Sequence, residues 1–250
     1  MKKVSVLLAA FLVTATAPAL SQGHAMGDAS EAAPFGMPVD DQHVWVHLIA
    51  DQLEGRWGGG SGFRWNAEAW AGTDTDRVWV KSEGVLAGSG ALEEGRHELL
   101  YARPITSFFD AQLGLRMDAD NRPGRAWAAL GVEGLAPLFM HVSATGYVSD
   151  GGRLAGRLEG SYDLLLTQEL VLQPRLELNL YSRSDAARLT GAGLSDLETG
   201  LRLRYEVSRK FAPYVGFSYE NRFAGSANLA RLAGEKSAHM QFVAGLRLWY

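Results

Sequence analysis

Imidazole and thioether side chains, both of which can bind metal ions, are concentrated in one short part of the chain, residues 23–47. These side chains are the imidazoles and thioethers of His24, Met26, Met37, His43 and His47. A thioether is a soft ligand that selects Cu(I), whereas an imidazole suits both oxidation states of copper. Carboxylates in the same segment would add harder ligands for Cu(II), namely Asp28, Glu31, Asp40 and Asp41. An ordinary polar linker has a similar composition, so the residue types alone leave both interpretations open.

His43 and His47 share the parity of Asp51, so all three would lie on one face of a strand. The two imidazoles would be about 13 Å apart along that strand, too far to bind one ion by themselves. Each therefore needs partners from the preceding segment or from a neighbouring strand, and the candidates are Asp41, Glu68 and His239. For Glu68, the alternative to metal binding is a salt bridge with Lys81. For the two histidines, the alternative is a position as polar residues at the rim of a β-barrel, the fold that the strand pattern described below predicts.

The N-terminus has the features of a secretory signal. Lys2 and Lys3 precede an apolar run at residues 4–13, and small residues at 15–23 offer cleavage sites. No later apolar run in the sequence approaches the ~20 residues that a transmembrane helix needs. We therefore expect residues 1–22 to be a signal peptide and residues 23–42 to be a flexible periplasmic arm.

From about residue 43 onward, apolar and polar residues alternate with the period of two that is typical of β-strands. In residues 196–207, one face carries Glu198, Arg202, Arg204 and Glu206, and the other carries Leu197, Leu201, Leu203 and Tyr205. Such strands are roughly nine to eleven residues long, which is the length that a tilted strand needs to cross a bilayer. The alternation fits either a soluble all-β protein with an apolar interior or a transmembrane barrel with an apolar outside.

Three features favour the barrel: the strand length, the charges of both signs on the polar faces, such as Arg157 with Glu159, and the need to close the sheet in lipid. We predict that residues 43–250 form an all-β, closed antiparallel transmembrane β-barrel of about twelve strands, with ten or fourteen as alternatives. Residues 183–195 and 221–238 are the predicted longer loops on the outer surface. The final strand, which ends on an aromatic residue, resembles the C-terminal strand of bacterial outer-membrane barrels.

Several long strings indicate a family. They are "GMPVDDQHVWVHLIADQLEGR" (36–56), "RVWVKSEG" (77–84), "ALGVEGLAP" (130–137), "YDLLLTQELVLQPRLELNL" (162–180) and "GLSDLETGLRLRYEVSRKFAPYVG" (193–216). With the aromatic C-terminus, they resemble the copper resistance protein B family through nearly all of residues 36–250. The resemblance implies an outer-membrane component of a copper resistance system, with copper as its ligand. Many members carry longer Met/His-rich N-terminal segments, so in this chain the barrel is the element shared with them.

Other functional classes have little support in the sequence. A net charge of −4 gives no basic field for nucleic acid, and the absence of cysteine excludes disulfides and thiolate chemistry. His141 and Ser143 could form a nucleophile pair, but the outward parity belongs to Met140, Val142 and Ala144, which places the pair in the lumen. We expect no enzymatic activity.

The sequence thus predicts a bacterial outer-membrane barrel that binds copper and contributes to copper tolerance by sequestration or transport. Its expected partners are copper, the lipid of the outer membrane and a periplasmic copper-binding protein. The alternative is a structural barrel without a metal role.

Overall fold

The computed structural model describes residues 43–250 except residues 60, 121 and 123. The predicted signal peptide and arm therefore lie outside the described residues. So do four of the proposed copper ligands, His24, Met26, Met37 and Asp41. Within the described part, no helix is both long enough and apolar enough to cross a membrane.

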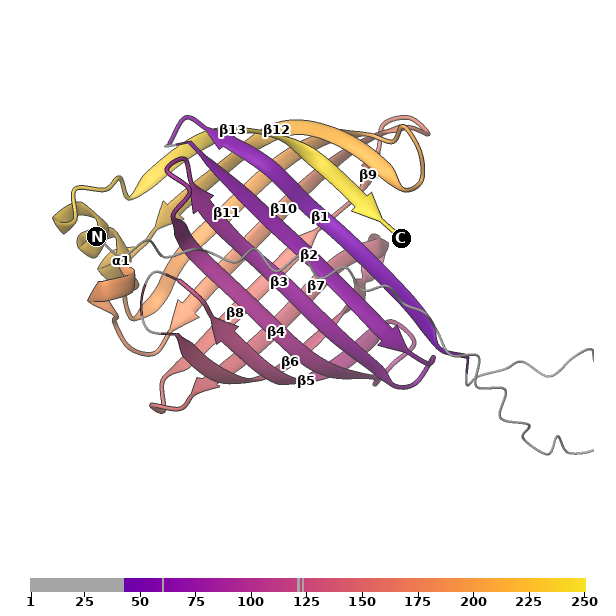
Figure 1. Ribbon diagram of the computed structural model, residues 1–250, viewed down its shortest axis with the longest axis horizontal. Coiled ribbons are helices and arrows are strands. Elements are labelled where there is room, and N and C mark those ends of the chain that lie inside the picture. The colour runs from indigo at the N-terminus through magenta and orange to yellow at the C-terminus, as the bar shows by residue number, and fades with distance from the viewer. Residues whose placement is uncertain (1–42, 60, 121, 123) are drawn as a thin grey trace, which may run out of the picture. The chain divides into compact units, whose positions relative to one another are not determined.

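The described strands form one antiparallel sheet that closes on itself, because β13 pairs with β1 (Figure 1). The strands are β1 (Trp45–Trp57), β2 (Gly62–Gly72), β3 (Arg77–Ala87), β4 (Leu92–Pro104), β5 (Phe109–Asp118), β6 (Arg125–Ala136), β7 (Met140–Ser149), β8 (Leu154–Ser161), β9 (Leu164–Leu165), β10 (Leu170–Tyr181), β11 (Gly193–Tyr205), β12 (Phe211–Arg222) and β13 (Ala238–Trp249). β8 and β9 both pair with β10 and follow each other along it, so they form one interrupted strand. Across residues 43–250 this makes a barrel of twelve strands, as the sequence predicts.

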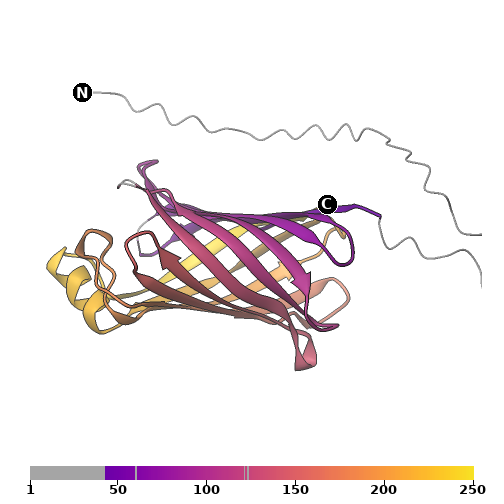
Figure 2. The ribbon, with the colours of Figure 1, turned by 90° about the horizontal axis from the view of Figure 1, so that it is seen from below.

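The two ends of the barrel differ. At the end that holds Tyr250, the connections are short turns at residues 73–76, 105–108, 137–139, 166–169 and 206–210, and we call it the short-turn end. At the opposite, long-loop end, residues 182–192 contain the 3₁₀ turn η2 (Ala186–Arg188), and residues 223–237 contain helix α1 (Ala224–Leu232). The strands run obliquely between these ends (Figure 2). Both predicted long loops are confirmed, although each is shorter than predicted because the adjoining strands extend further.

The side chains alternate between an apolar outside and a polar inside. Leu115 and Leu130 are 61% and 65% exposed on the outer face, whereas Glu54 and Arg202 are 0% and 2% exposed in the lumen. Buried charges with exposed leucines are the reverse of a soluble protein and the expected order in lipid. The soluble all-β alternative is therefore wrong.

The first strand contains a β-bulge that changes its parity. The pairing of β1 with β2 shifts between Ala50 and Gln52, and its pairing with β13 shifts between Ala50 and Leu53. Asp51 contacts the lumenal Arg247, and Gln52 next to it is 1% exposed, so consecutive residues both face inward. In a bulge, two residues of one strand lie opposite one residue of the partner strand, so the residues that face inward change parity along the strand. Odd-numbered residues face inward before the bulge and even-numbered residues after it.

Candidate functional site

A connected network of ion pairs fills the middle of the lumen. The arginines in it are Arg56, Arg64, Arg96, Arg157, Arg175, Arg202 and Arg247, and the carboxylates are Asp51, Glu54, Glu83, Glu159, Glu177 and Glu198. We call this set the lumenal plug. It includes Arg157 and Glu159, whose opposite charges on one polar face favoured a barrel in the sequence.

The plug joins walls that lie far apart around the barrel. Arg64 on β2 contacts Glu177 on β10 at 3.3 Å, and Arg157 on β8 bonds Glu83 on β3. In the closed order of strands, each of these pairs is separated by at least four intervening strands. Side chains from nearly opposite walls therefore meet directly, and the middle of the lumen is crossed by guanidinium–carboxylate contacts.

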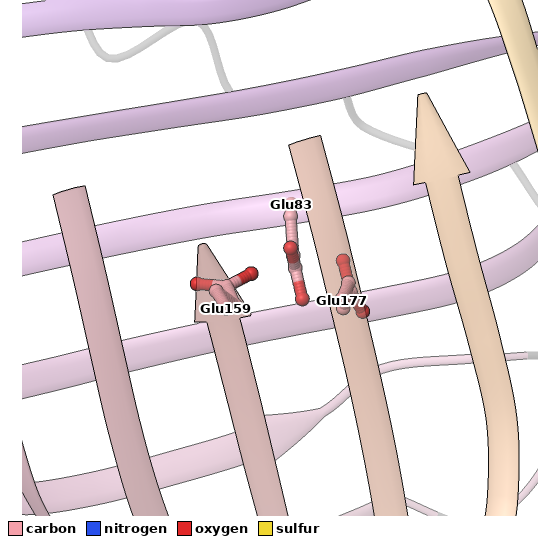
Figure 3. A group of neighbouring side chains, drawn as sticks. All are labelled: Glu83, Glu159 and Glu177. Atoms are coloured by element: carbon pink, nitrogen blue, oxygen red, sulfur yellow. The ribbon is translucent and has the colours of Figure 1, made fainter. Parts of the chain in front are cut away.

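Three plug residues have the geometry of a metal site. Oxygen atoms of Glu83, Glu159 and Glu177 all lie within 4.8 Å of one another (Figure 3). However, Arg157 contacts all three carboxylates. Further guanidiniums reach the same group, since Arg96 is 3.0 Å from Glu83 and Arg175 is 3.2 Å from Glu159. With its negative charge neutralised by these guanidiniums, the cluster acts as part of the plug.

His47 lies in a row of aromatic rings at the short-turn end. Its ring centroid is 5.8 Å from that of Trp70 and 5.6 Å from that of Trp249, and Trp70 is 6.0 Å from Trp79. We call Trp249, His47, Trp70 and Trp79 the aromatic row. It runs along the inner wall from β13 across β1 and β2 to β3. His43 lies at the same end but is exposed and contacts Trp45, with ring centroids 4.4 Å apart.

The proposed partner His239 lies elsewhere. The register that closes the barrel pairs Trp57 with Phe242, which puts His239 beyond the end of β1, at the long-loop end. There its Nε2 is 3.5 Å from Glu220. Because His47 and Trp57 are ten residues apart, the two ends of this wall are separated by roughly 30 Å. The expectation that His239 approaches His43 and His47 is wrong. Parity assigns a residue to one face of its strand, but it does not tell which residue of β1 lies opposite it when the barrel closes.

Glu68 faces the lumen near the aromatic row. It pairs with Ile49 on the adjacent strand β1 and lies two residues from Trp70 on its own strand. Lys81 lies opposite Glu68 on the other adjacent strand, β3, and the sequence suggested a salt bridge between them. The ammonium group of Lys81 instead bonds Glu133. Glu68 is thus the one proposed carboxylate within the described residues that the fold brings near His47.

The structure does not join His141 and Ser143 into a nucleophile pair. Ser143 Oγ donates to Glu159 at 3.2 Å, while His141 is exposed at the start of β7. A Ser–His contact that the sequence analysis missed occurs on the outer face, where Ser82 Oγ is 3.1 Å from His97 Nδ1. Trp65 Nε1 donates to the same oxygen at 3.1 Å. Pairing of β3 with β4 brings these residues together, which no local motif signals.

Comparison with known proteins identifies the family. The family model described as "Copper resistance protein B precursor (CopB)" matches residues 44–250. Copper resistance protein B of Escherichia coli is 41% identical over 228 residues, which cover 89% of this chain and 77% of that protein. The chain belongs to the copper resistance protein B family. The copper resistance protein B homolog of Pseudomonas syringae pv. tomato is 40% identical, over 89% of this chain and 77% of its own length.

A solved structure supports the fold. The NanC porin aligns with a TM-score of 0.52 and 11% identity, over 82% of this chain and 99% of that one. At this identity the likeness concerns the fold alone. Family membership and the closed barrel with its apolar outside establish an outer-membrane protein of copper resistance, as the sequence predicts. In such barrels the short turns face the periplasm, which assigns the aromatic row to the periplasmic mouth.

Proposed function

We propose that this member of the copper resistance protein B family binds copper at the periplasmic mouth of its barrel. His43 and His47 would be the principal imidazole ligands, and His24, Met26 and Met37 would add softer ligands from the arm. The observation that supports this most is the position of His47, which faces the lumen in the aromatic row at the end where the arm joins the barrel.

The surroundings of His47 suit a copper ion. Aromatic faces attract cations electrostatically, and Trp is the most effective of them. Trp70 and Trp249 flank the imidazole. The ring of Trp70 already engages a cation, since the guanidinium of Arg77 lies 5.2 Å from its centroid. A single imidazole does not complete a copper site, so thioethers from the arm are the natural additional ligands for Cu(I).

The lumenal plug bears on how copper tolerance is achieved. Free passage of an ion would require separation of buried ion pairs such as Arg56–Glu198, whose atoms are 2.7 Å apart. Leaving one member of a buried pair without its partner costs about 3–5 kcal/mol, so such pairs resist separation and disfavour a permanently open pore. We therefore propose sequestration at the periplasmic mouth as the main activity. Delivery by a periplasmic copper-binding protein would supply the ion at this end.

Deletion of residues 23–42 tests this assignment. In purified protein, the deletion should weaken Cu(I) binding through loss of the thioethers, while Cu(II) binding should persist on His43 and His47. Both are measured by competition with chelators of known affinity. A matched control replaces Met240, which is 57% exposed on the outer wall, with Leu and should change neither. Unchanged Cu(I) binding after the deletion would contradict a role for the arm.

A further inference from the structure

A groove lies in the outer wall of the barrel, on the face that contacts lipid. Its volume is about 290 Å³, and its lining includes Ala144 and Gly146 of β7, Gly156 and Leu158 of β8 and Leu180 of β10. We propose that this groove holds part of one acyl chain of an outer-leaflet lipid whose phosphate head group binds Arg183 at the rim above it. The site lies outside the lumen and uses neither histidine nor methionine, so it stands independently of the copper site proposed above.

Two glycines that the barrel itself does not need keep the groove open. Gly146 and Gly156 are paired across β7 and β8, and neither has the positive φ that would favour glycine. A Cβ atom at Gly146 would come no closer than 3.8 Å to a non-adjacent residue, and one at Gly156 no closer than 3.9 Å. The outward Gly84 differs, because a Cβ atom there would meet the ring of Trp65 at 2.3 Å. Glycine weakens a strand and often marks a place where a ligand approaches closely, so these two positions indicate an occupant from outside the barrel.

The lining suits a hydrocarbon chain. The exposed side chains in the groove are those of Ala144, Leu158 and Leu180, all of them apolar. A closed apolar cavity of about 150 Å³ holds a benzene molecule, so a groove of this size has room for a segment of one acyl chain.

The groove lies near the rim at the long-loop end. Gly156 is three residues from Arg153, which is in the turn between β7 and β8. Leu180 pairs with Gly156 and is three residues from Arg183. Three residues of a strand span roughly 10 Å. Because this end faces away from the periplasm, a lipid of the outer leaflet with its head group at the rim would extend its acyl chains along the groove.

The loops above the groove carry an excess of positive charge. Residues 119–125, 150–153 and 182–190 contain five arginines and three aspartates, which gives a formal charge of +2. The arginines are Arg122, Arg125, Arg153, Arg183 and Arg188. At the same end of the barrel, residues 88–94 and 223–237 contain two basic and three acidic residues. The positive charge is therefore concentrated on the side of the rim where the groove lies.

Arg183 is the arginine available to a head group. Arg125 donates to Asp185 at 2.7 Å and Arg188 donates to Asp120 at 2.9 Å, so these guanidiniums are engaged within the loops. Arg183 is exposed, and its side chain has no hydrogen bond or ion pair with the described residues. A guanidinium matches the geometry of a phosphate group and binds it through two parallel hydrogen bonds. Charge and position together thus favour a phosphate-bearing lipid over a neutral one.

Dimyristoyl phosphatidic acid is a suitable probe because it combines acyl chains with a phosphate group. It is added to full-length protein in detergent, and bound lipid is counted by native mass spectrometry. Dimyristoylglycerol has the same chains without the phosphate and should bind at least tenfold more weakly. Gly156→Val fills the groove and Arg183→Gln removes the head-group contact, so each should weaken binding of phosphatidic acid at least fivefold. Ala244→Val on β13 and Arg209→Gln in a periplasmic turn are the matched controls and should leave binding unchanged.

A loss of folding is not the expected cause of weaker binding. Valine is favoured in strands, and a Cβ atom at Gly156 has room. Heat-modifiable migration on gels confirms that each variant forms a barrel. Equal binding of the two lipids, or wild-type binding by either Gly156→Val or Arg183→Gln, would overturn the proposal. A dimer in the mass spectra that Gly156→Val converts to a monomer would also overturn it, because a second copy of the chain would then occupy the groove.

Discussion

Removal of Glu54 should destabilise the barrel strongly. Glu54 is 0% exposed and accepts hydrogen bonds from Arg202 Nε and Nη2, both at 2.9 Å. Arg56 Nε and the hydroxyl of Tyr214 also donate to it, each at 2.9 Å. Within the described residues, Arg202 has no ion pair with another carboxylate and is 2% exposed. Glu54→Ala would therefore leave an uncompensated buried guanidinium, and the free energy of unfolding should fall by about 3–5 kcal/mol.

The free energy is measured by urea unfolding of the barrel in lipid vesicles, followed by tryptophan fluorescence. Glu235→Ala is the control, because Glu235 is 52% exposed and its pair with Arg222 should contribute only about 0–1 kcal/mol. Adding Arg202→Met to a Glu54→Leu variant should recover most of the loss, since an apolar pair of similar volume replaces a buried ion pair at little cost. A loss below about 1 kcal/mol for Glu54→Ala would refute a dry, closed plug.

Three further predictions concern the membrane face, the outer loops and assembly. Leu130→Arg, midway along β6, should destabilise the barrel by about 2–4 kcal/mol, whereas Asn179→Arg in the lumen should be milder because Glu177 and Asp196 lie within reach. Urea unfolding compares them, and the reverse order would contradict the assigned faces. Partial burial raises the pKa of Asp185, but hydrogen bonds and charges from Arg125 and Arg188 outweigh this and hold the pKa below its ordinary value. This stabilisation is present above about pH 4 and is lost as the pH falls through the lower pKa of the folded state, so hydrogen exchange in residues 182–192 should rise there. Deletion of Trp249 and Tyr250 should reduce the amount of heat-modifiable barrel in outer-membrane fractions, since Tyr250 exchanges two backbone hydrogen bonds with Leu48; normal assembly would contradict a role for the terminal strand.

The fold followed from the sequence because each strand carries its own signal. Alternation of apolar and polar residues specifies the two faces of a strand locally. The length of the strands then indicates that the apolar face contacts lipid on the outside of a barrel. The break between β8 and β9 and the bulge in β1 were not predictable, because both depend on pairing with neighbouring strands. A bulge reverses parity without any change in composition.

The candidate site was predictable in part. The sequence proposed Glu68 as a partner of His47 from a neighbouring strand, and the structure places both in the lumen near the short-turn end. His239 was misplaced because closure fixes the register of β13 against β1, and no local pattern encodes that register. The aromatic row and the Glu83, Glu159 and Glu177 cluster draw residues from distant strands, so only the closed barrel brings them together.

The most direct test of the account is copper binding by the His43→Ala, His47→Ala double variant. Affinities for Cu(I) and Cu(II) are measured by chelator competition on purified barrels, and copper tolerance is measured in cells that express each variant at equal levels. A variant with Ala in place of His97, which lies on the outer face, serves as the matched control. The account predicts that the double variant loses Cu(II) binding, weakens Cu(I) binding and lowers tolerance, while the control behaves as wild type. Normal copper binding and full protection by the double variant would contradict the proposed site at the periplasmic mouth.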